Sequence, residues 1–311
     1  MKLHKTEPMS KPTVSVLITT YNHAEHIAKC LDSVLMQKTN FSFELVIGED
    51  GSDDGTQEIC KQYAERYPEI IRLAIRDQSK KVYLYGRATG KYNLMQTLLD
   101  GRGEYFALCD GDDYWTDEHK LQKQVDFMQS NPTFSFCSTD RRILKDGVIS
   151  RDEGLEVAFS KSGGAPIVIT KRNFFSPYLV KSNTILLRRN CLDFELLQER
   201  YTEVKDTFIY YILLNKGDGI VQPWLTSDYR VHQGGMWTSL SRFGMAKMNH
   251  HTIRGMYRSY LGEDEVVKEF YRGTLFAYFK SSVRNYKWRD IWTSFSEGPV
   301  ICIRGALSML K

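Results

Sequence analysis

The chain has 311 residues, of which 42% are hydrophobic and 26% are charged, as in an ordinary globular protein with a substantial core. The net charge of +4 is low, and the cations are scattered except near the C-terminus, which excludes nucleic acid as a partner. The six cysteines form no CxxC pair, so we expect reduced thiols rather than disulfides or a zinc site. No apolar run reaches the length of a membrane span or signal-peptide core, so we expect a cytoplasmic protein.

Strands and helices alternate along the first part of the chain. Apolar and β-branched runs predict strands at Thr13–Thr20, Phe43–Ile47, Ile70–Ile75 and Tyr105–Cys109. Helical spacing follows the first two strands, whereas a polar loop through Gly90 and a helix at Tyr92–Leu99 follow the third. Such alternation predicts right-handed crossovers and a mostly parallel sheet.

The later part of the chain is less regular. We expect a helix at Thr116–Ser130, strands at Phe134–Ser138 and Asn183–Arg188, and a helix that opens at Asp206. The segment Arg141–Ser176 is interpreted as an irregular loop over the site. The predicted domains are an N-terminal extension (1–11), a catalytic domain (12–240) and a helical C-terminal region (241–311).

Polar turns follow three of the predicted strands. They are Tyr21–Asn22, Glu49–Asp50 and Asp110–Asp113, and in parallel sheets ligands bind at this edge. Asp110, Asp112 and Asp113 lie so close in sequence that their charges repel unless a cation or hydrogen-bond donors offset them. Mg²⁺ or Mn²⁺ is the simplest cation, because each binds one or two carboxylates together with substrate phosphates. A solvated acidic turn is the alternative.

Four segments, in order and spacing, resemble the motifs of family 2 nucleotide-sugar glycosyltransferases: Val14–Asn22, Glu49–Thr56, Gly103–Trp115 and Tyr229–His232. The resemblance covers about residues 12–237. It implies the GT-A fold, with a Rossmann-like, mostly parallel central sheet flanked by helices, followed here by a helical extension. It also implies metal-dependent, inverting transfer of a sugar from a nucleotide-diphosphate donor, a UDP-sugar, to a hydroxyl of a glycan or lipid-linked acceptor in surface polysaccharide biosynthesis.

The resemblance also assigns roles residue by residue. Asp50 is expected to accept a hydrogen bond from the base, and the residue before it, often Asp in relatives, is Glu49 here. The metal, Mn²⁺ or Mg²⁺, is assigned to Asp112, with Asp110 and His232. Nucleotide contacts are assigned to Thr19, Thr20, Tyr21, Asn22, Glu49, Asp50, Asp110 and Gly111. A carboxylate that only stabilises its own turn remains the alternative for Asp50, as does a histidine satisfied within its loop for His232.

The general base is assigned to Asp206, with Glu203 as its rival and a helix-capping carboxylate as the alternative interpretation. Contacts to the diphosphate or the acceptor are assigned to Arg230, Asp113, Trp115 and Trp237. The two tryptophans could stack on a sugar, although aromatic residues are more often part of the core.

Other functions fit the sequence less well. A nucleotidyltransferase usually has a glycine-rich loop after its first strand, and Thr19–His23 contains no glycine. A non-catalytic module that binds nucleotide sugars remains open. The C-terminal segment 280–311 mixes Trp288, Trp292 and Phe295 with cations, which predicts either contact with the inner membrane surface or packing on protein.

Overall fold

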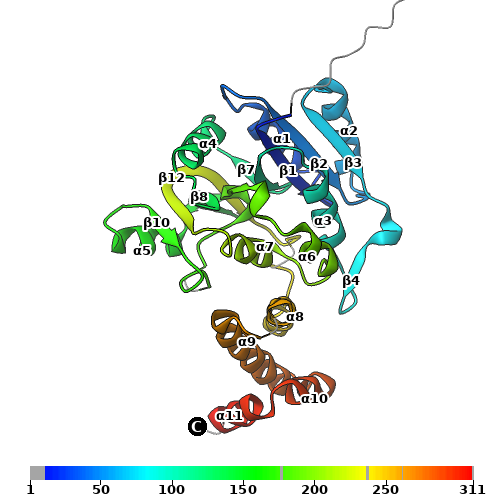
Figure 1. Cartoon of the computed structure of the whole chain (residues 1–311). Helices are drawn as coiled ribbons and strands as arrows, with labels where there is room; N and C mark the ends of the chain where they lie inside the picture. Colours follow the sequence, from blue (N-terminus) through cyan, green and yellow to red (C-terminus); the bar gives the residue numbers. More distant parts are fainter. Residues whose placement is uncertain (1–10, 176–177, 236–237, 261, 310–311) are drawn as a thin grey trace, which may run out of the picture.

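The computed structural model describes residues 11–175, 178–235, 238–260 and 262–309. A mixed central sheet with the strand order β10-β12-β8-β11-β6-β1-β2-β3 forms the centre of the main domain (Figure 1). The strands are β1 (Val14–Thr20), β2 (Phe43–Glu49), β3 (Ile71–Ile75), β4 (Val82–Leu84), β5 (Arg87–Thr89), β6 (Tyr105–Asp110), β7 (Tyr114–Trp115), β8 (Phe136–Lys145), β9 (Val148–Arg151), β10 (Ile167–Ile169), β11 (Leu186–Arg188) and β12 (Gly219–Val231). The helices of this domain are α1 (Ile27–Leu35), α2 (Thr56–Arg66), α3 (Lys91–Asp100), α4 (Lys120–Ser130), α5 (Glu153–Lys161), α6 (Phe194–Glu199) and α7 (Asp206–Leu213).

The first half of the sheet is parallel, as the sequence predicts. β1 pairs in parallel with both β2 and β6, and β2 pairs in parallel with β3. Side chains of β1 alternate between two apolar layers, with Val16 packing toward α1, α2 and α4, and Leu17 toward α3 and α7. Because both faces are covered, these strands are apolar almost throughout and are recognised in the sequence. The expected α/β fold with a mostly parallel central sheet is confirmed.

The second half of the sheet differs from the sequence prediction. Segment 141–176, expected to be an irregular loop, contains the end of β8, all of β9 and β10, and α5. β9 is exposed along its whole length, so no apolar alternation marks it. The long strand β12 was also missed, because its pairing with β8 shifts register between Gln222 and Ser227, which breaks the two-residue period.

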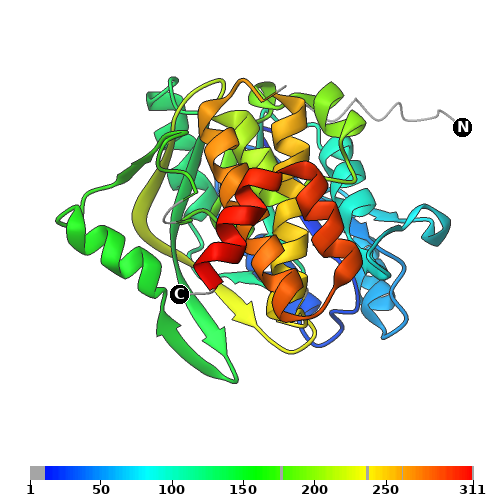
Figure 2. The same cartoon turned by 90° about the horizontal axis from the view of Figure 1, so that it is seen from below.

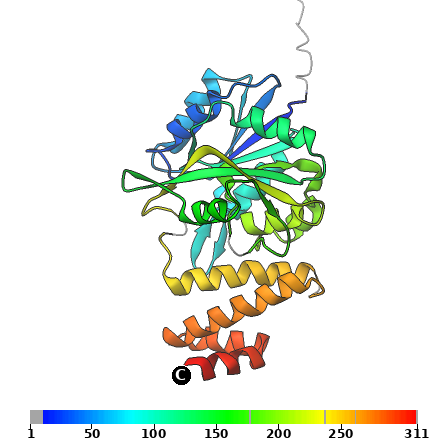
Figure 3. The same cartoon turned by 90° about the vertical axis from the view of Figure 1, so that its left-hand side faces the viewer.

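In the described part of the chain, four helices follow the main domain: α8 (Arg242–Ser259), α9 (Glu265–Arg284), α10 (Trp288–Glu297) and α11 (Pro299–Met309). They form a layer beneath the domain (Figures 2 and 3). The β4–β5 hairpin descends to α8, where the hydroxyl of Tyr85 lies 3.3 Å from Nδ1 of His251. Within the described ranges, none of the helices has the length and apolar character needed to cross a membrane.

Candidate functional site

A cavity of about 860 Å³ lies at the carboxyl edge of β1, β2 and β6. Its walls come from these strand ends, from the β4–β5 hairpin, from the start of α7, and from α8 and α10. The main domain and the C-terminal helices therefore enclose it together. Side chains separated by more than two hundred residues in sequence, such as those of Thr19 and Asp290, line the same space.

One carboxylate and two imidazoles meet in this cavity. Oδ2 of Asp112 lies 3.0 Å from Nε2 of His232 and 3.8 Å from Nε2 of His23. Candidate ligand atoms of the three residues all lie within 4.8 Å of one another. Burial alone would raise the pKa of Asp112, but the hydrogen bond with His232 and the nearby His23 keep that pKa below its ordinary value. An ionised carboxylate beside imidazole nitrogens is a suitable donor set for a divalent metal.

His23 was not assigned from the sequence. Its backbone N–H donates to Oγ1 of Thr56, and its Nδ1 lies 3.2 Å from Oγ1 of Thr20. These contacts fix the ring so that Nε2 is directed to Asp112. Burial also lowers the pKa of His23, which favours the neutral imidazole that a metal requires. The only sequence signal was its position just after β1, beside the polar turn.

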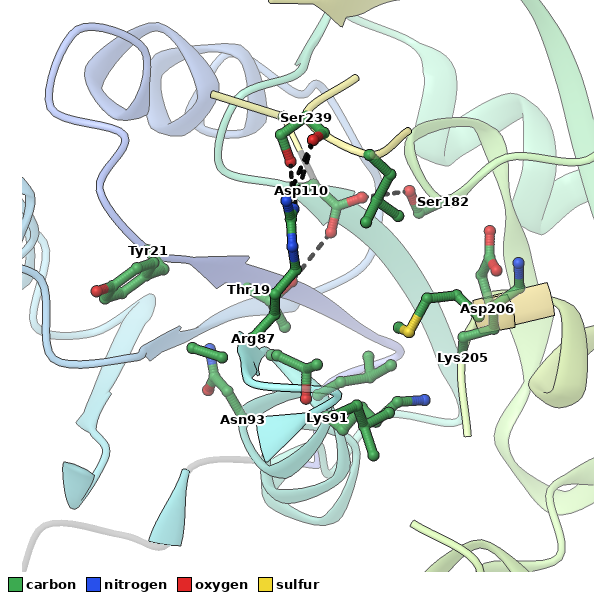
Figure 4. A pocket seen from close by; sticks show the side chains of 18 of the residues that line it. Thr19, Tyr21, Arg87, Lys91, Asn93, Asp110, Ser182, Lys205, Asp206 and Ser239 are labelled. Atoms are coloured by element: carbon green, nitrogen blue, oxygen red, sulfur yellow. Dashed lines mark hydrogen bonds between the residues drawn. The ribbon is translucent and has the colours of Figure 1, made fainter. Parts of the chain in front are cut away.

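Asp110 is held by two hydroxyl groups at the end of β6. Oγ1 of Thr19 donates to one of its carboxylate oxygens at 3.0 Å, and Oγ of Ser182 donates to the other at 2.5 Å (Figure 4). Burial and the neighbouring charge of Asp112 raise the pKa of Asp110 to about 6. In the structure His23, rather than Asp110, accompanies Asp112 and His232. Asp110 lines the cavity beside this cluster, and its expected part in the metal site stays a prediction.

A second group of side chains lines the cavity at the end of β2. Oδ2 of Asp50 lies 3.3 Å from Nζ of Lys81, and the same ammonium lies 3.4 Å from the centre of the Tyr21 ring. Burial raises the pKa of Asp50, and the charge of Lys81 opposes that shift. Lys81 was missed because it precedes the β4–β5 hairpin in a segment interpreted as a polar loop. Together with Thr20, these residues form a polar recess with one aromatic ring.

Asp206 lines the cavity at the first turn of α7. Its Oδ1 accepts from the N–H of Thr207 at 2.6 Å, and its Oδ2 accepts from the hydroxyl of Tyr178 at 3.2 Å. The carboxylate thus stabilises the start of its helix and also faces the cavity. The rival, Glu203, accepts instead from Thr202, packs against α8 and does not line the cavity.

The family model of glycosyl transferase family 2 matches residues 15–190, more than half of the chain. The chain belongs to this family. The uncharacterized protein Rv1520 of Mycobacterium tuberculosis is 29% identical over 232 residues, which cover 73% of this chain and 61% of that protein. The putative teichuronic acid biosynthesis glycosyltransferase TuaG of Bacillus subtilis is 35% identical over 127 residues, 40% of this chain and 46% of that protein. The chain therefore spans about half to three fifths of the length of these curated relatives.

Solved structures of similar shape confirm the fold. S. aureus TarS in complex with UDP-GlcNAc superposes with a TM-score of 0.59 at 15% identity, covering 86% of this chain and 81% of that one. The mannosyltransferase PcManGT from Pyrobaculum calidifontis, in complex with GDP-Man and Mn²⁺, has a TM-score of 0.56 at 18% identity, covering 98% of this chain and 82% of that one.

Three residues that are expected to contact the nucleotide shape the loops of this family 2 protein. Glu49 is fully buried and accepts from the N–H groups of Gly51 and Ser52, which closes the turn after β2. Asn22 has a φ of 54° and exchanges hydrogen bonds with Asp53. A Cβ on Gly111 would lie 2.5 Å from Oγ1 of Thr20, so no larger residue fits there. Glu49, Asn22 and Gly111 do not line the cavity, and their expected contacts to the nucleotide stay predictions.

Of the described residues that are expected to contact the diphosphate or the acceptor, Arg230 lines the cavity, whereas Asp113 and Trp115 are buried. Arg230 lines the cavity and donates from Nε to the carbonyl of Asp112 at 2.8 Å. Asp113 is buried and accepts from the N–H of Arg230, so it ties the acidic turn to β12. Trp115 is only 1% exposed and donates to the carbonyl of Asn183, which excludes stacking on a sugar. Trp237 lies outside the described residues. Trp115 is therefore part of the core, whereas the expected contact of Asp113 stays a prediction.

Proposed function

We propose that this protein transfers a sugar, with inversion, from a nucleotide-diphosphate donor to a hydroxyl of a glycan or lipid-linked acceptor in surface polysaccharide biosynthesis. The observation that carries the proposal is the convergence, on one cavity, of the Asp112, His232 and His23 cluster with Asp206 of α7. Family membership supports it, because all four segments that carry the family motifs contribute residues to that cavity.

The donor's nucleoside is assigned to the recess formed by Asp50, Lys81, Tyr21 and Thr20. A carboxylate can accept the imino N–H of uracil, and an exposed tyrosine ring offers a stacking surface for the base. UDP is our proposed nucleotide. The complexes of TarS with UDP and UDP-GlcNAc support this choice, whereas that of PcManGT with GDP-Man makes a guanine nucleotide the alternative to test.

The proposed cofactor is Mn²⁺ or Mg²⁺, held by Asp112, His232 and His23. A divalent cation there would offset the negative charge that develops on the leaving diphosphate. PcManGT in complex with Mn²⁺ supports this assignment. Arg230 lines the same part of the cavity and adds a permanent positive charge.

Asp206 is the proposed general base. Its carboxylate takes the proton of the acceptor hydroxyl while that oxygen bonds to the anomeric carbon of the sugar. The bond from the anomeric carbon to the phosphate oxygen breaks, and the nucleoside diphosphate leaves with the electron pair. Direct attack on the face opposite the leaving group gives inversion. Tyr178 and Thr207 hold the carboxylate in place through the hydrogen bonds described above.

Thermal-shift measurements on the full chain with UDP-sugars and GDP-sugars, each with and without Mn²⁺, test the donor assignment. A donor that binds the folded chain should raise its melting temperature by mass action. If the donor binds at the proposed site, this increase should occur only in the presence of Mn²⁺. The donor that binds is then incubated with lipid-linked and soluble glycan acceptors. Metal-dependent binding without release of nucleoside diphosphate would indicate the non-catalytic alternative, and no binding of any donor would refute the proposal.

The outer face of α10 supports a peripheral contact of the protein with the cytoplasmic face of the membrane. Trp288 is 69% exposed, Trp292 is 72% exposed and Phe295 is 38% exposed, and their spacing places them on one helix face. The exposed side chains of Lys287 and Arg289 lie beside them in sequence. Interfacial aromatic rings flanked by cations suit an anionic lipid surface.

Cosedimentation with vesicles tests this contact. The wild-type chain should sediment with phosphatidylglycerol vesicles at low salt, and the double variant Trp288→Ser/Trp292→Ser should lose most of that binding. A double variant at exposed apolar residues of the main domain, Val148→Ser/Ile149→Ser, serves as the control. If the wild type stays in the supernatant, the exposed face of α10 belongs to a protein contact.

A further inference from the structure

Lys91 is a buried cation that the steps of the proposed reaction do not involve. It is the first residue of α3, is 8% exposed and lines the cavity. Burial and the nearby charge of Lys205 lower the pKa of Lys91 to about 8. The dipole of α3 also opposes a cation at the start of the helix. Because these surroundings disfavour the charged form, the ammonium lowers the stability of the fold, and stability does not account for its presence.

The ammonium of Lys91 binds the turn that leads to the proposed base. Its Nζ donates to the carbonyl of Val204 at 2.6 Å, and Figure 4 shows the side chain extending toward the side of the cavity where Lys205 and Asp206 lie. Val204 is buried, Lys205 is the N-cap residue of α7 without a capping side-chain hydrogen bond, and Asp206 is the first residue of the helix. Because a peptide unit is planar, holding the Val204 carbonyl fixes the plane through which the chain enters α7. The bond therefore restrains the turn that carries the Asp206 carboxylate.

The same turn of α3 also binds the end of β2. Nδ2 of Asn93, two residues after Lys91, donates to the carbonyl of Gly48 at 2.7 Å, and both residues are buried. Gly48 lies two residues before Asp50, which belongs to the recess proposed for the nucleoside. The first turn of α3 thus holds one backbone carbonyl beside the donor recess and another beside the base. Because a helical turn is a rigid element, this arrangement restrains the distance between the donor and the base.

We propose that Lys91 is a positioning residue for the transfer reaction, which holds the turn before α7 so that the carboxylate of Asp206 reaches the acceptor hydroxyl beside the donor. The inference rests on the proposed function, because it takes Asp206 as the base. A hydrogen bond from an ammonium is stronger than one between neutral groups, so it restrains the carbonyl more firmly than a neutral side chain would. Misplacing the base by about 1 Å lowers the rate by roughly 10²-fold. A loss of stability is expected where a buried group serves the active site rather than the fold.

Replacing Lys91 by methionine tests this role in the full chain. Methionine keeps an unbranched stem but has no donor for the Val204 carbonyl. With saturating donor, Mn²⁺ and acceptor, kcat of Lys91→Met should fall by about tenfold to a hundredfold, whereas the donor Kd should remain that of the wild type. The melting temperature at pH 7 should rise above that of the wild type, because the buried charge is removed. A side chain that only supported the fold would lower the melting temperature and kcat together.

Two further measurements connect Lys91 to Asp206. If Lys91 acts through the base, adding Lys91→Met to Asp206→Asn should change kcat by less than about twofold, so the two losses should not add. Hydrogen exchange without substrate gives a readout that does not depend on activity. The backbone amides of Thr207 and Phe208, at the start of α7, should exchange about tenfold faster in Lys91→Met. Lys145→Met, at an exposed lysine outside the cavity, is the control and should keep the wild-type value in every measurement.

The positioning role is overturned if Lys91→Met has the kcat of Lys145→Met, if it melts below the wild type, or if its loss in kcat is undiminished in the Asp206→Asn background. Unchanged hydrogen exchange at the start of α7 overturns it as well. If the wild type shows no turnover with any donor and acceptor, the proposed function fails instead. Hydrogen exchange then still decides whether Lys91 holds the turn before α7.

Discussion

Replacing Asp206 by asparagine separates its two possible roles, base and helix stabiliser. The amide oxygen of asparagine can still accept from the N–H of Thr207, and the amide N–H₂ can donate to the hydroxyl oxygen of Tyr178. The shape of the side chain is unchanged, but it no longer accepts a proton. We therefore expect kcat to fall by about 10²–10⁴-fold, equivalent to ~2.7–5.4 kcal/mol in activation free energy.

The stability of Asp206→Asn should change much less. The substitution weakens the charge-assisted hydrogen bonds while leaving partners for both side-chain atoms, so we expect a loss of about 1 kcal/mol or less in the free energy of unfolding. For a chain of this size that corresponds to a melting temperature lower by about 2–4 °C. Donor binding should be nearly unchanged, because Asp206 lies across the cavity from the nucleoside recess.

The assay is release of nucleoside diphosphate with saturating donor and acceptor, alongside the melting temperature and the donor Kd. Glu203→Gln is the matched control, because it makes the same chemical change three residues earlier, outside the cavity. It should retain wild-type kcat. Turnover of Asp206→Asn within tenfold of wild type, or a collapse of turnover in Glu203→Gln, would contradict the assignment of the base.

Two further predictions concern the metal cluster and the buried lysine. Asp112→Ala should abolish both turnover and the stabilisation by Mn²⁺ in thermal-shift assays. If sugar transfer survives in this variant, or in the wild type after exhaustive chelation, Asp112 does not hold an essential metal. Between pH 8 and the ordinary lysine pKa of 10.5, Lys91 is neutral in the folded state but still protonated in the unfolded state. The stability of the wild type should therefore rise with pH over that window. Below pH 8 the buried charge of Lys91 lowers the free energy of unfolding of the wild type by up to about 3 kcal/mol. Lys91→Met removes that charge, but it also removes the hydrogen bond to Val204, which contributes about 1 kcal/mol. In denaturant unfolding, Lys91→Met should therefore be more stable than the wild type at pH 7, and this difference should disappear near pH 10. The same difference in stability at both pH values would contradict the lowered pKa of Lys91.

The sequence alone determined the architecture of the parallel half of the sheet. β1, β2 and β6 are buried on both faces, so their apolar runs are nearly continuous and each ends in a polar turn. Parallel pairing brings those turns to one edge of the sheet, which is why Asp50 and Asp112 were correctly expected near a common site. The exposed strand β9 and the bulged strand β12 carry no such period, and they were missed for that reason.

Only the tertiary structure decided which side chains of each turn reach the cavity. Within one turn, Asp112 faces two imidazoles, Asp110 is held by Thr19 and Ser182, and Asp113 is bound by the backbone of β12. These directions depend on partners up to 120 residues away, which local sequence patterns do not encode. His232 was named from its motif, whereas the sequence did not indicate that His23 and Lys81 reach the same cavity. The burial of Trp115 and of the charge of Lys91 likewise arises only when distant segments pack together, because burial is a property of the assembled fold.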